Sequence, residues 1–354
     1  MPDGGTMKTT TTGRLAPQLR DELERLIERH NKRAYNRCGK AVRNCSYRSE
    51  VARRATILLA FGELAQLGYR LRDPRNLADK HVRALARHWN EKGLSSQTIH
   101  GRFSVLRVFS GWIGKRGLVG DLPGYFPGKD MRRQIAATRN HGWEANGVSP
   151  EELVRRARGI DERLALYLNL QHVFGLRAKE AIMLRPLRAI TPDGGHLEVS
   201  DGTKGGRPRL VPIDSDERRA AIAWAREVAS RTRSHCLRWP GLTWEQAQAR
   251  FYRGLAKLGV TRRQLGVTSH GLRHGYAQQA YRVLTGQPSP VEGGALGRID
   301  RERHRLAGMK VSALLGHGRV DVTGYYYGSY GHALRLSPEI HLARQKEAPL
   351  RESG

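Results

Sequence analysis

The stretch ALLGHGRVDVTGYYYG, residues 313–328, places three adjacent tyrosines behind a Leu-Gly-His sequence. Three neighbouring phenols cannot all face one core, because on a helix they spread over most of the circumference and on a strand the middle one opposes the other two. At least one of Tyr325, Tyr326 and Tyr327 is therefore expected to reach an exposed cleft. Taken alone, such a triplet usually forms an aromatic patch that packs with a solvated rim, so its interpretation depends on the rest of the chain.

The chain is strongly basic. Its 354 residues include 62 lysines and arginines against 33 aspartates and glutamates, which gives a net charge of +29 and a sequence pI near 10.9. The excess runs through both halves and predicts a large polyanionic partner, for which nucleic acid fits best. Of the basic residues, 12 are lysines and 50 are arginines, and guanidinium makes bidentate contacts to phosphate that ammonium cannot make. A biased base composition would explain the preference for arginine over lysine, but not so large a net charge.

Length and hydropathy favour two globular domains without a membrane span. Hydrophobic residues make up 39% of the sequence, enough for sizeable cores, and there is no apolar run of about 18 residues. Residues 1–17 lack the apolar centre of a secretory signal and are expected to form a flexible tail. The three cysteines have no metal-binding spacing and cannot all pair, which favours structural roles in a reducing cytoplasm. They are Cys38, Cys45 and Cys236.

Helical periodicity divides the chain into a helical first domain and a longer second one. Residues 121–148 are rich in glycine and proline, have no sustained period and are expected to be a linker. After them, Ser149-Pro150-Glu151-Glu152 has the form of a helix start. The expected arrangement is a tail at 1–17, a basic helical domain at 18–120 with helices at 18–41, 49–67, 77–91 and 95–114, a linker at 121–148, a second domain at 149–345 and a tail at 346–354.

The second domain is expected to be mainly helical with a small β-hairpin, an α+β fold. Gly175-Leu176-Arg177 reads as a turn that opens a short helix, and residues 196–213 read as two strands around a glycine-rich turn that carries Lys204. A stretch with two prolines and several glycines, residues 285–305, interrupts the helical pattern. The remaining helices are expected at about 216–230, 243–258, 269–284 and 306–315.

Several residues of this domain suit phosphoryl transfer. Its transition state gathers negative charge, which two guanidiniums can stabilise, and it needs a nucleophile, a base and an acid for the departing oxygen. Arg177 opens a helix and Glu180 can orient it, while His270 and Arg273 share one helix face. Each motif alone is weak evidence for a catalytic role, but the whole set in this order is far less expected by chance. The set is Arg177, Glu180, Lys204, His270, Arg273, His317 and, nine residues later, Tyr326.

This order of motifs resembles the tyrosine recombinase family, also called the phage integrases. The resemblance covers residues 149–330 and is strong at 174–185, 268–277 and 313–327. It implies that Arg177 and Arg273 clamp the phosphate, that Lys204 is the hairpin acid and that His270 pairs with the second arginine. It also implies that His317 occupies a site filled by His or Trp in the family. The spacing from Leu-Gly-His selects Tyr326 as nucleophile, with Tyr325 and Tyr327 as alternates.

The resemblance implies site-specific DNA recombination or integration through a 3′-phosphotyrosyl intermediate, with no cofactor and no metal ion. Its partners would be double-stranded DNA and three further copies of the chain in a tetramer on two sites, with a directionality or DNA-bending factor as an additional partner. The helical first domain resembles the family's core-binding (SAM-like) domain in helix count and charge. The implied location is the cytoplasm, at the bacterial nucleoid. Residues 285–305 look inserted relative to the family pattern.

Three other functions stay open from the sequence. A type IB topoisomerase would use similar chemistry without joining two sites, and a telomere resolvase would produce hairpin ends. A non-catalytic DNA-binding regulator on the same scaffold is the alternative of a different class, although it would not need a phenol at this position.

Overall fold

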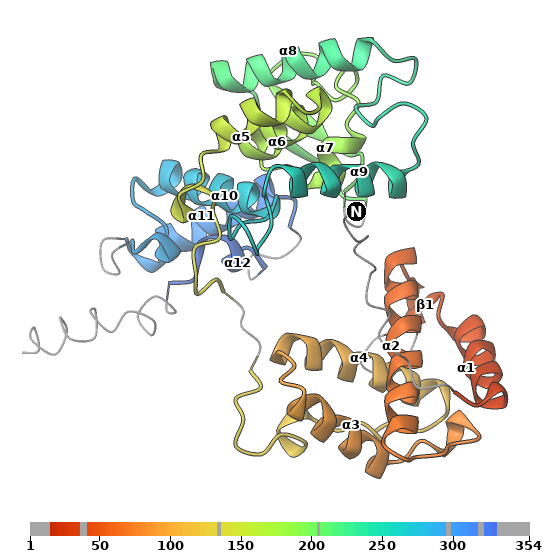
Figure 1. Cartoon of the computed structure of the whole chain (residues 1–354). Coiled ribbons are helices and arrows are strands. Elements are labelled where there is room, and N and C mark those ends of the chain that lie inside the picture. Colours follow the sequence, from red (N-terminus) through yellow and green to blue (C-terminus); the bar gives the residue numbers. More distant parts are fainter. Residues whose placement is uncertain are drawn as a thin grey trace, which may run out of the picture. The chain divides into compact units, whose positions relative to one another are not determined.

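The computed structural model describes residues 15–35, 41–132, 136–203, 206–294, 299–317 and 322–330. It divides into two compact units, Met1–Arg133 and Gln134–Gly354 (Figure 1). The boundary falls inside the glycine- and proline-rich stretch 121–148. Residues on both sides of it are packed, because Phe126 and Met131 are buried in the first unit, and Trp143 and Val148 in the second.

The first unit is a helical bundle with one small sheet. Its aromatic core residues Phe61, Trp89, Phe103 and Phe109 are all at most 1% exposed, and Phe103 packs edge-on to Trp89 at a centroid distance of 5.8 Å. The buried Glu63 carboxylate accepts a hydrogen bond from the Trp89 indole at 2.7 Å. The helices are α1 (Pro17–His30), α2 (Tyr47–Gln66), α3 (Asp79–Glu91) and α4 (Ser96–Trp112), and the antiparallel strands are β1 (Arg33–Tyr35) and β2 (Ala41–Asn44).

The expected helix at 18–41 is wrong beyond His30. Helix α1 ends there, and Arg33–Tyr35 pairs with Ala41–Asn44 as a short sheet. The apolar face of the helix ends at Ile27, the last buried residue of α1, and the charged and polar residues 28–33 that follow offer no apolar side chain for the core. Without such burial a helix gains little from continuing. The other three helices begin and end within two residues of the expected positions.

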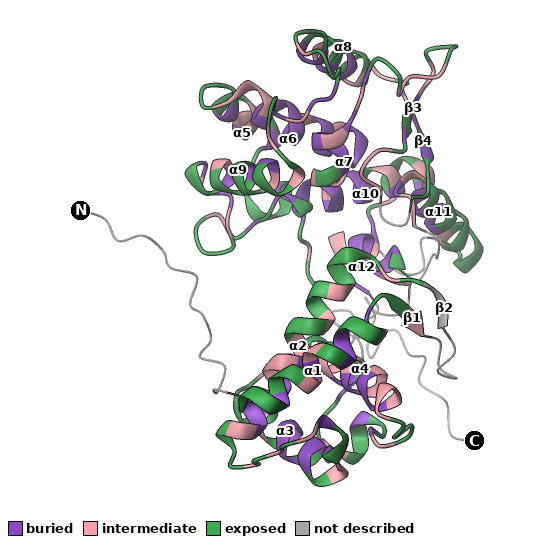
Figure 2. Cartoon of the chain, turned by 90° about the vertical axis from the view of Figure 1, so that its right-hand side faces the viewer, coloured by how far each residue is buried: buried purple, intermediate pink, exposed green. Residues whose placement is uncertain are grey.

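Helix α6 (Glu162–Phe174) is the centre of the second unit. It packs against α5 (Pro150–Arg158), α7 (Ala178–Met183), α8 (Asp216–Ser230) and α10 (His270–Thr285), and it is largely buried in Figure 2. Asp161 starts α6 by accepting hydrogen bonds from the backbone N–H groups of Arg163 and Leu164. The remaining elements are β3 (His196–Val199), β4 (Arg209–Pro212), α9 (Trp244–Lys257), α11 (Arg301–Leu314), α12 (Gly324–Tyr327) and the 3-10 turns η3 (Glu144–Asn146) and η4 (Pro290–Glu292).

The hairpin and the Gly-Leu-Arg turn are confirmed. Strands β3 and β4 pair antiparallel, with His196 opposite Pro212, and Gly175 ends α6 with φ +61° before α7 begins. The expected start at residue 306 for the helix before the tyrosines is wrong, because α11 begins at Arg301. Asp300 caps it by accepting a hydrogen bond from the Arg303 backbone N–H at 2.6 Å. In the sequence this capping residue is difficult to recognise, because other charged residues surround it. Within the part of the chain described, no helix combines the length and the apolar character that crossing a bilayer requires.

Candidate active site

Tyr326 lies on α12 within a cluster of arginine and histidine side chains. Its ring centroid is 5.4 Å from that of His270, 4.7 Å from His274 and 5.1 Å from His317. The Arg273 Nε donates to the Tyr326 hydroxyl at 3.4 Å. Tyr326 is 7% exposed. The phenol oxygen therefore lies beside a guanidinium and the phenol ring lies against three imidazole rings, an arrangement that suits a nucleophile in phosphoryl transfer.

The three adjacent tyrosines face different surroundings. Tyr327 stacks on Tyr281 of α10 at a centroid distance of 5.0 Å and is buried, whereas Tyr325 is 38% exposed. Tyr326 is the one whose hydroxyl contacts Arg273. This distribution agrees with the geometric argument that three phenols on one short helix cannot share one environment.

Glu180 joins the arginines of the site. Its carboxylate is fully buried and accepts from Arg177 Nη1 at 2.5 Å and from both terminal nitrogens of Arg209 at 3.0 and 2.7 Å, while Arg273 Nη1 lies 3.9 Å away. Burial by itself raises the pKa of Glu180, but the hydrogen bonds of Arg209 and the charges of the three arginines outweigh it and lower the pKa to about 2. The carboxylate is therefore ionised and holds the guanidiniums in place.

The two candidate arginines differ in exposure. Arg273 is fully buried and also donates to the carbonyl oxygens of Gly175 and Leu315, whereas the Arg177 side chain is 23% exposed. Burial and the charge of Arg177 lower the pKa of Arg273 to about 10, which leaves it protonated near neutral pH. The pair offers one fixed guanidinium and one that faces solvent.

The candidate histidines are neutral near pH 7. Burial, followed by the charges of Arg273 and Arg177, lowers the pKa of His270 to about 4 and that of His317 to about 3. His317 Nε2 lies 3.3 Å from Arg273 Nη2, and its Nδ1 lies 3.0 Å from the Thr323 hydroxyl. Since Arg273 can only donate, His317 Nε2 accepts and Nδ1 carries the proton.

The structure brings together six of the seven residues that the sequence singled out for chemistry. Arg177, Glu180, His270, Arg273, His317 and Tyr326 share one cluster. Lys204 lies outside the described residues. No cluster of three or more histidine, cysteine or carboxylate side chains suited to a metal ion occurs in the described ranges.

Sequence reasoning missed Arg209 and His274. Arg209 is on β4, far from the Gly-Leu-Arg turn in sequence, and no local motif links it to Glu180. His274 follows His270 by one helical turn, and that spacing could have indicated a shared face. Burial, followed by the nearby His270, lowers its pKa to about 3, and its Nδ1 is buried without a hydrogen-bond partner.

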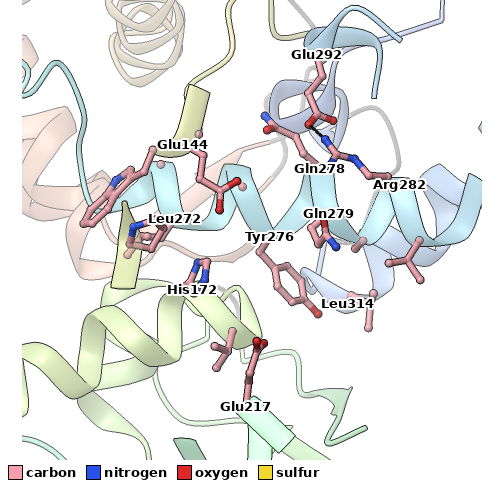
Figure 3. Close-up of a pocket in the computed structure, with 18 of the residues that line it drawn as sticks. Glu144, His172, Glu217, Leu272, Tyr276, Gln278, Gln279, Arg282, Glu292 and Leu314 are labelled. Atoms are coloured by element: carbon pink, nitrogen blue, oxygen red, sulfur yellow. Dashed lines mark hydrogen bonds and ion pairs between the residues drawn. The ribbon is translucent and has the colours of Figure 1, made fainter. Parts of the chain in front are cut away.

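A cavity of about 1050 Å³ lies on another side of α10 (Figure 3). Glu144, His172, Glu217 and Tyr276 are among its lining residues. Of the residues in the Tyr326 cluster, none lines it. This cavity is therefore separate from the candidate active site, although α10 contributes to both.

Sequence comparisons match both units. The sequence model of a family described as "Integrase" matches residues 144–279, and that of "Phage integrase, N-terminal" matches residues 37–119. Tyrosine recombinase XerC from Xanthomonas axonopodis pv. citri (strain 306) is 25% identical over 282 residues, which are 76% of this chain and 80% of the relative. XerC from Xanthomonas campestris pv. campestris (strain B100) is 25% identical over 217 residues, or 58% of this chain, and this match spans 62% of the relative's length.

Solved structures of similar fold include two of lambda integrase. A dimer bound to a COC′ core site has a TM-score of 0.55 at 16% identity, covering 88% of this chain and 96% of that one. A tetramer bound to a Holliday junction has a TM-score of 0.54 at 13% identity, covering 88% and 78%. At these identities the likeness concerns the fold. It confirms the expected mainly helical architecture with a small sheet.

Proposed function

We propose that this chain, which belongs to the tyrosine recombinase (phage integrase) family, cleaves and rejoins DNA at a specific site with Tyr326 as nucleophile. The observation that carries the proposal is the Tyr326 hydroxyl beside Arg273, with Arg177 held next to it by the buried Glu180. A phenol, two guanidiniums and neutral imidazoles in one cluster are what phosphodiester transfer to tyrosine needs.

In the proposed step, the Tyr326 oxygen attacks a DNA phosphorus. The new O–P bond forms as the bond from phosphorus to the 5′ oxygen breaks, which leaves a 3′-phosphotyrosyl link and a free 5′-hydroxyl. The phenol proton passes to neutral His270, and Lys204 supplies the proton that the 5′ oxygen takes up. Because one phosphate ester replaces another, the reverse attack by a 5′-hydroxyl rejoins the strand without an external energy source.

The arginines stabilise the transition state, and His317 supports one of them. Arg273 and Arg177 place positive charge where the nonbridging oxygens gain negative charge. His317 Nε2 accepts from Arg273 at 3.3 Å, so the imidazole fixes the guanidinium in its working orientation. These charges act on the phosphate directly, without a metal ion in the step.

Duplex DNA and further copies of the chain are the proposed partners. The net charge of +29 suits phosphate contacts along a duplex. The related lambda integrase structures are a dimer on a core site and a tetramer on a Holliday junction, which supports assembly of several copies of this chain on DNA. The basic first unit would also contact the duplex through its phosphates.

A covalent trap tests the proposal. Nicked duplex DNA that carries the chain's own recombination site is incubated with the protein in EDTA, and denaturing electrophoresis separates covalent complexes. We expect a protein–DNA band with wild type, Tyr325→Phe and Tyr327→Phe, and none with Tyr326→Phe. If the band is lost in Tyr325→Phe or Tyr327→Phe instead, the nucleophile is that tyrosine and not Tyr326. No band despite tight binding to a verified site would favour a non-catalytic DNA-binding regulator.

The products distinguish recombination from related activities. Two DNA molecules that carry the site should exchange arms. Relaxation of supercoils without exchange would indicate a type IB topoisomerase, and hairpin ends from a palindromic site would indicate a telomere resolvase.

A further inference from the structure

The segment 136–143, here called the strap, contacts the helix that carries the tyrosines. The Ala137 backbone N–H donates to the Gly324 carbonyl at 2.9 Å. Gln278 on α10 forms a second connection, because its Nε2 donates to Asn140 Oδ1 at 2.9 Å and to the Tyr326 carbonyl at 3.0 Å. One amide nitrogen thus links the strap to the backbone of Tyr326.

The two bridging side chains are held in defined positions. Gln278 is 5% exposed. Asn140 Oδ1 also accepts from the Gly142 backbone N–H at 2.8 Å, a local Asn turn that fixes the side chain independently of Gln278. A Cβ at Gly142 would lie 3.1 Å from Asn140 Oδ1 and 3.2 Å from Gln278 Oε1, so the strap packs closely against the bridge.

The strap is also anchored to the start of α10. The Trp143 indole N–H donates to the Thr268 carbonyl at 2.7 Å, and Trp143 is 1% exposed. A Cβ at Gly271 would lie 2.6 Å from the His141 carbonyl oxygen. This close approach places the strap against the turn of α10 that carries His270 and Arg273. One segment therefore contacts both the phosphate-binding helix and the tyrosine helix.

Helix α12 needs such outside support. It has four residues, and a helix this short gains too few internal hydrogen bonds to keep its place alone. Its position relative to Arg273 must therefore come from contacts with other elements. A displacement of about 1 Å at a reacting group can slow a reaction roughly 100-fold.

We propose that Asn140 and Gln278 are positioning residues that set the location of the Tyr326 phenol through its backbone carbonyl. The inference rests on the proposed function, since it assigns the residues a part in DNA cleavage. Neither side chain touches the reacting atoms. Their effect is to hold α12 so that the Tyr326 hydroxyl stays beside Arg273.

Matched substitutions separate the hydrogen bonds from packing. Gln278→Met keeps a side chain of similar length but removes the donor, and Asn140→Leu removes the acceptor at similar volume. Asn140→Asp keeps the acceptor oxygen, so it should restore the bridge. Gln279→Met is the matched control, because Gln279 is the exposed neighbour of Gln278 on α10. Both glutamines line the cavity (Figure 3), so an effect that came from the cavity itself would appear in both variants.

The measurements are the single-turnover rate of phosphotyrosyl adduct formation at saturating nicked DNA and the Kd for the same DNA. We expect Gln278→Met and Asn140→Leu to form adduct about 10- to 100-fold more slowly, with Kd within about twofold of wild type. Asn140→Asp and Gln279→Met should react at close to the wild-type rate. A positioning role thus changes the rate, whereas general loss of folding would also weaken binding.

Several outcomes would overturn the inference. Adduct formation at the wild-type rate in both Gln278→Met and Asn140→Leu would show that the bridge does not matter. Equal slowing by Asn140→Leu and Asn140→Asp would show that the acceptor oxygen of Asn140 does not set the rate. Weaker DNA binding in step with the slower rate would show that the substitutions act through folding. Absence of adduct in wild type would instead reject the proposed function, so the two failures are distinguishable.

Discussion

The charge of a single buried carboxylate organises the arginines of the candidate site. Glu180 is fully buried, yet it lies within 4 Å of Arg177, Arg209 and Arg273. Removing one partner from a buried ion pair is costly because the remaining charges stay desolvated. The same carboxylate therefore contributes to folding and to the placement of the arginines of the candidate site.

We predict that Glu180→Gln lowers the free energy of unfolding at neutral pH. The difference in unfolding free energy between wild type and variant should shrink as the pH is lowered. The pKa of Glu180 falls from an ordinary value of 4.5 to about 2, which corresponds to on the order of 3 kcal/mol. A lowered pKa stabilises the folded state above pH 4.5, and this contribution disappears as the pH falls toward 2. Urea unfolding of wild type and variant between pH 7 and pH 2.5 measures this difference in the free energy of unfolding.

Glu198→Gln is the control, since Glu198 is an exposed carboxylate on β3 and its substitution should change stability by less than about 0.5 kcal/mol. If the difference in unfolding free energy between wild type and Glu180→Gln stayed constant across this pH range, ionisation of Glu180 would not be its cause.

At the scale of elements, the turn between α6 and α7 brings the two arginine motifs together. Gly175 has φ +61° at the end of α6, and its carbonyl accepts from Arg273 on α10. A Cβ at this position would lie 2.3 Å from the Tyr276 ring. Glycine is therefore required both for the left-handed backbone and for close packing of α10.

We predict that Gly175→Ala is more destabilising than Gly194→Ala. Both glycines have a positive φ, +61° and +71°, but a Cβ at Gly194 would meet no atom within 4 Å. Gly194→Ala should cost about 1–2 kcal/mol for the backbone alone, and Gly175→Ala a further 1–3 kcal/mol or so for overpacking. Thermal or urea unfolding compares the two. Equal losses would mean that α10 moves aside without cost.

For the whole molecule, the dominant property is positive charge. A net charge of +29 raises the local concentration of a polyanion and favours phosphate contacts at many positions. Such contacts release condensed counterions from DNA, so the affinity depends steeply on salt. Base-specific contacts add selectivity and depend less on salt.

We predict that DNA affinity falls by about 10³- to 10⁵-fold between 50 and 200 mM salt, the range for six to ten phosphate contacts. Fluorescence anisotropy with labelled duplex at several KCl concentrations measures the slope. Adding EDTA at constant ionic strength is the control and should leave Kd unchanged. A Kd that hardly varied with salt would refute recognition dominated by phosphate.

The sequence by itself determined the features that depend on neighbouring residues. Capping by Ser149, the Gly175 turn, the antiparallel hairpin and the i, i+3 pair of His270 and Arg273 all follow from local backbone and side-chain geometry. The order of these motifs was enough to indicate the family. Where local signals were ambiguous, as between His30 and Ala41, the helix expected from periodicity did not continue.

Tertiary structure alone decided which groups meet across the chain. Arg209 joins Glu180, Asn140 reaches Tyr326 through Gln278, and Tyr326 rather than Tyr327 contacts Arg273. No helical or strand spacing in the sequence predicts these pairings, because each depends on how the helices and the hairpin pack around α6. The choice among three identical neighbouring side chains is set by the direction in which each points from α12, and packing fixes that direction.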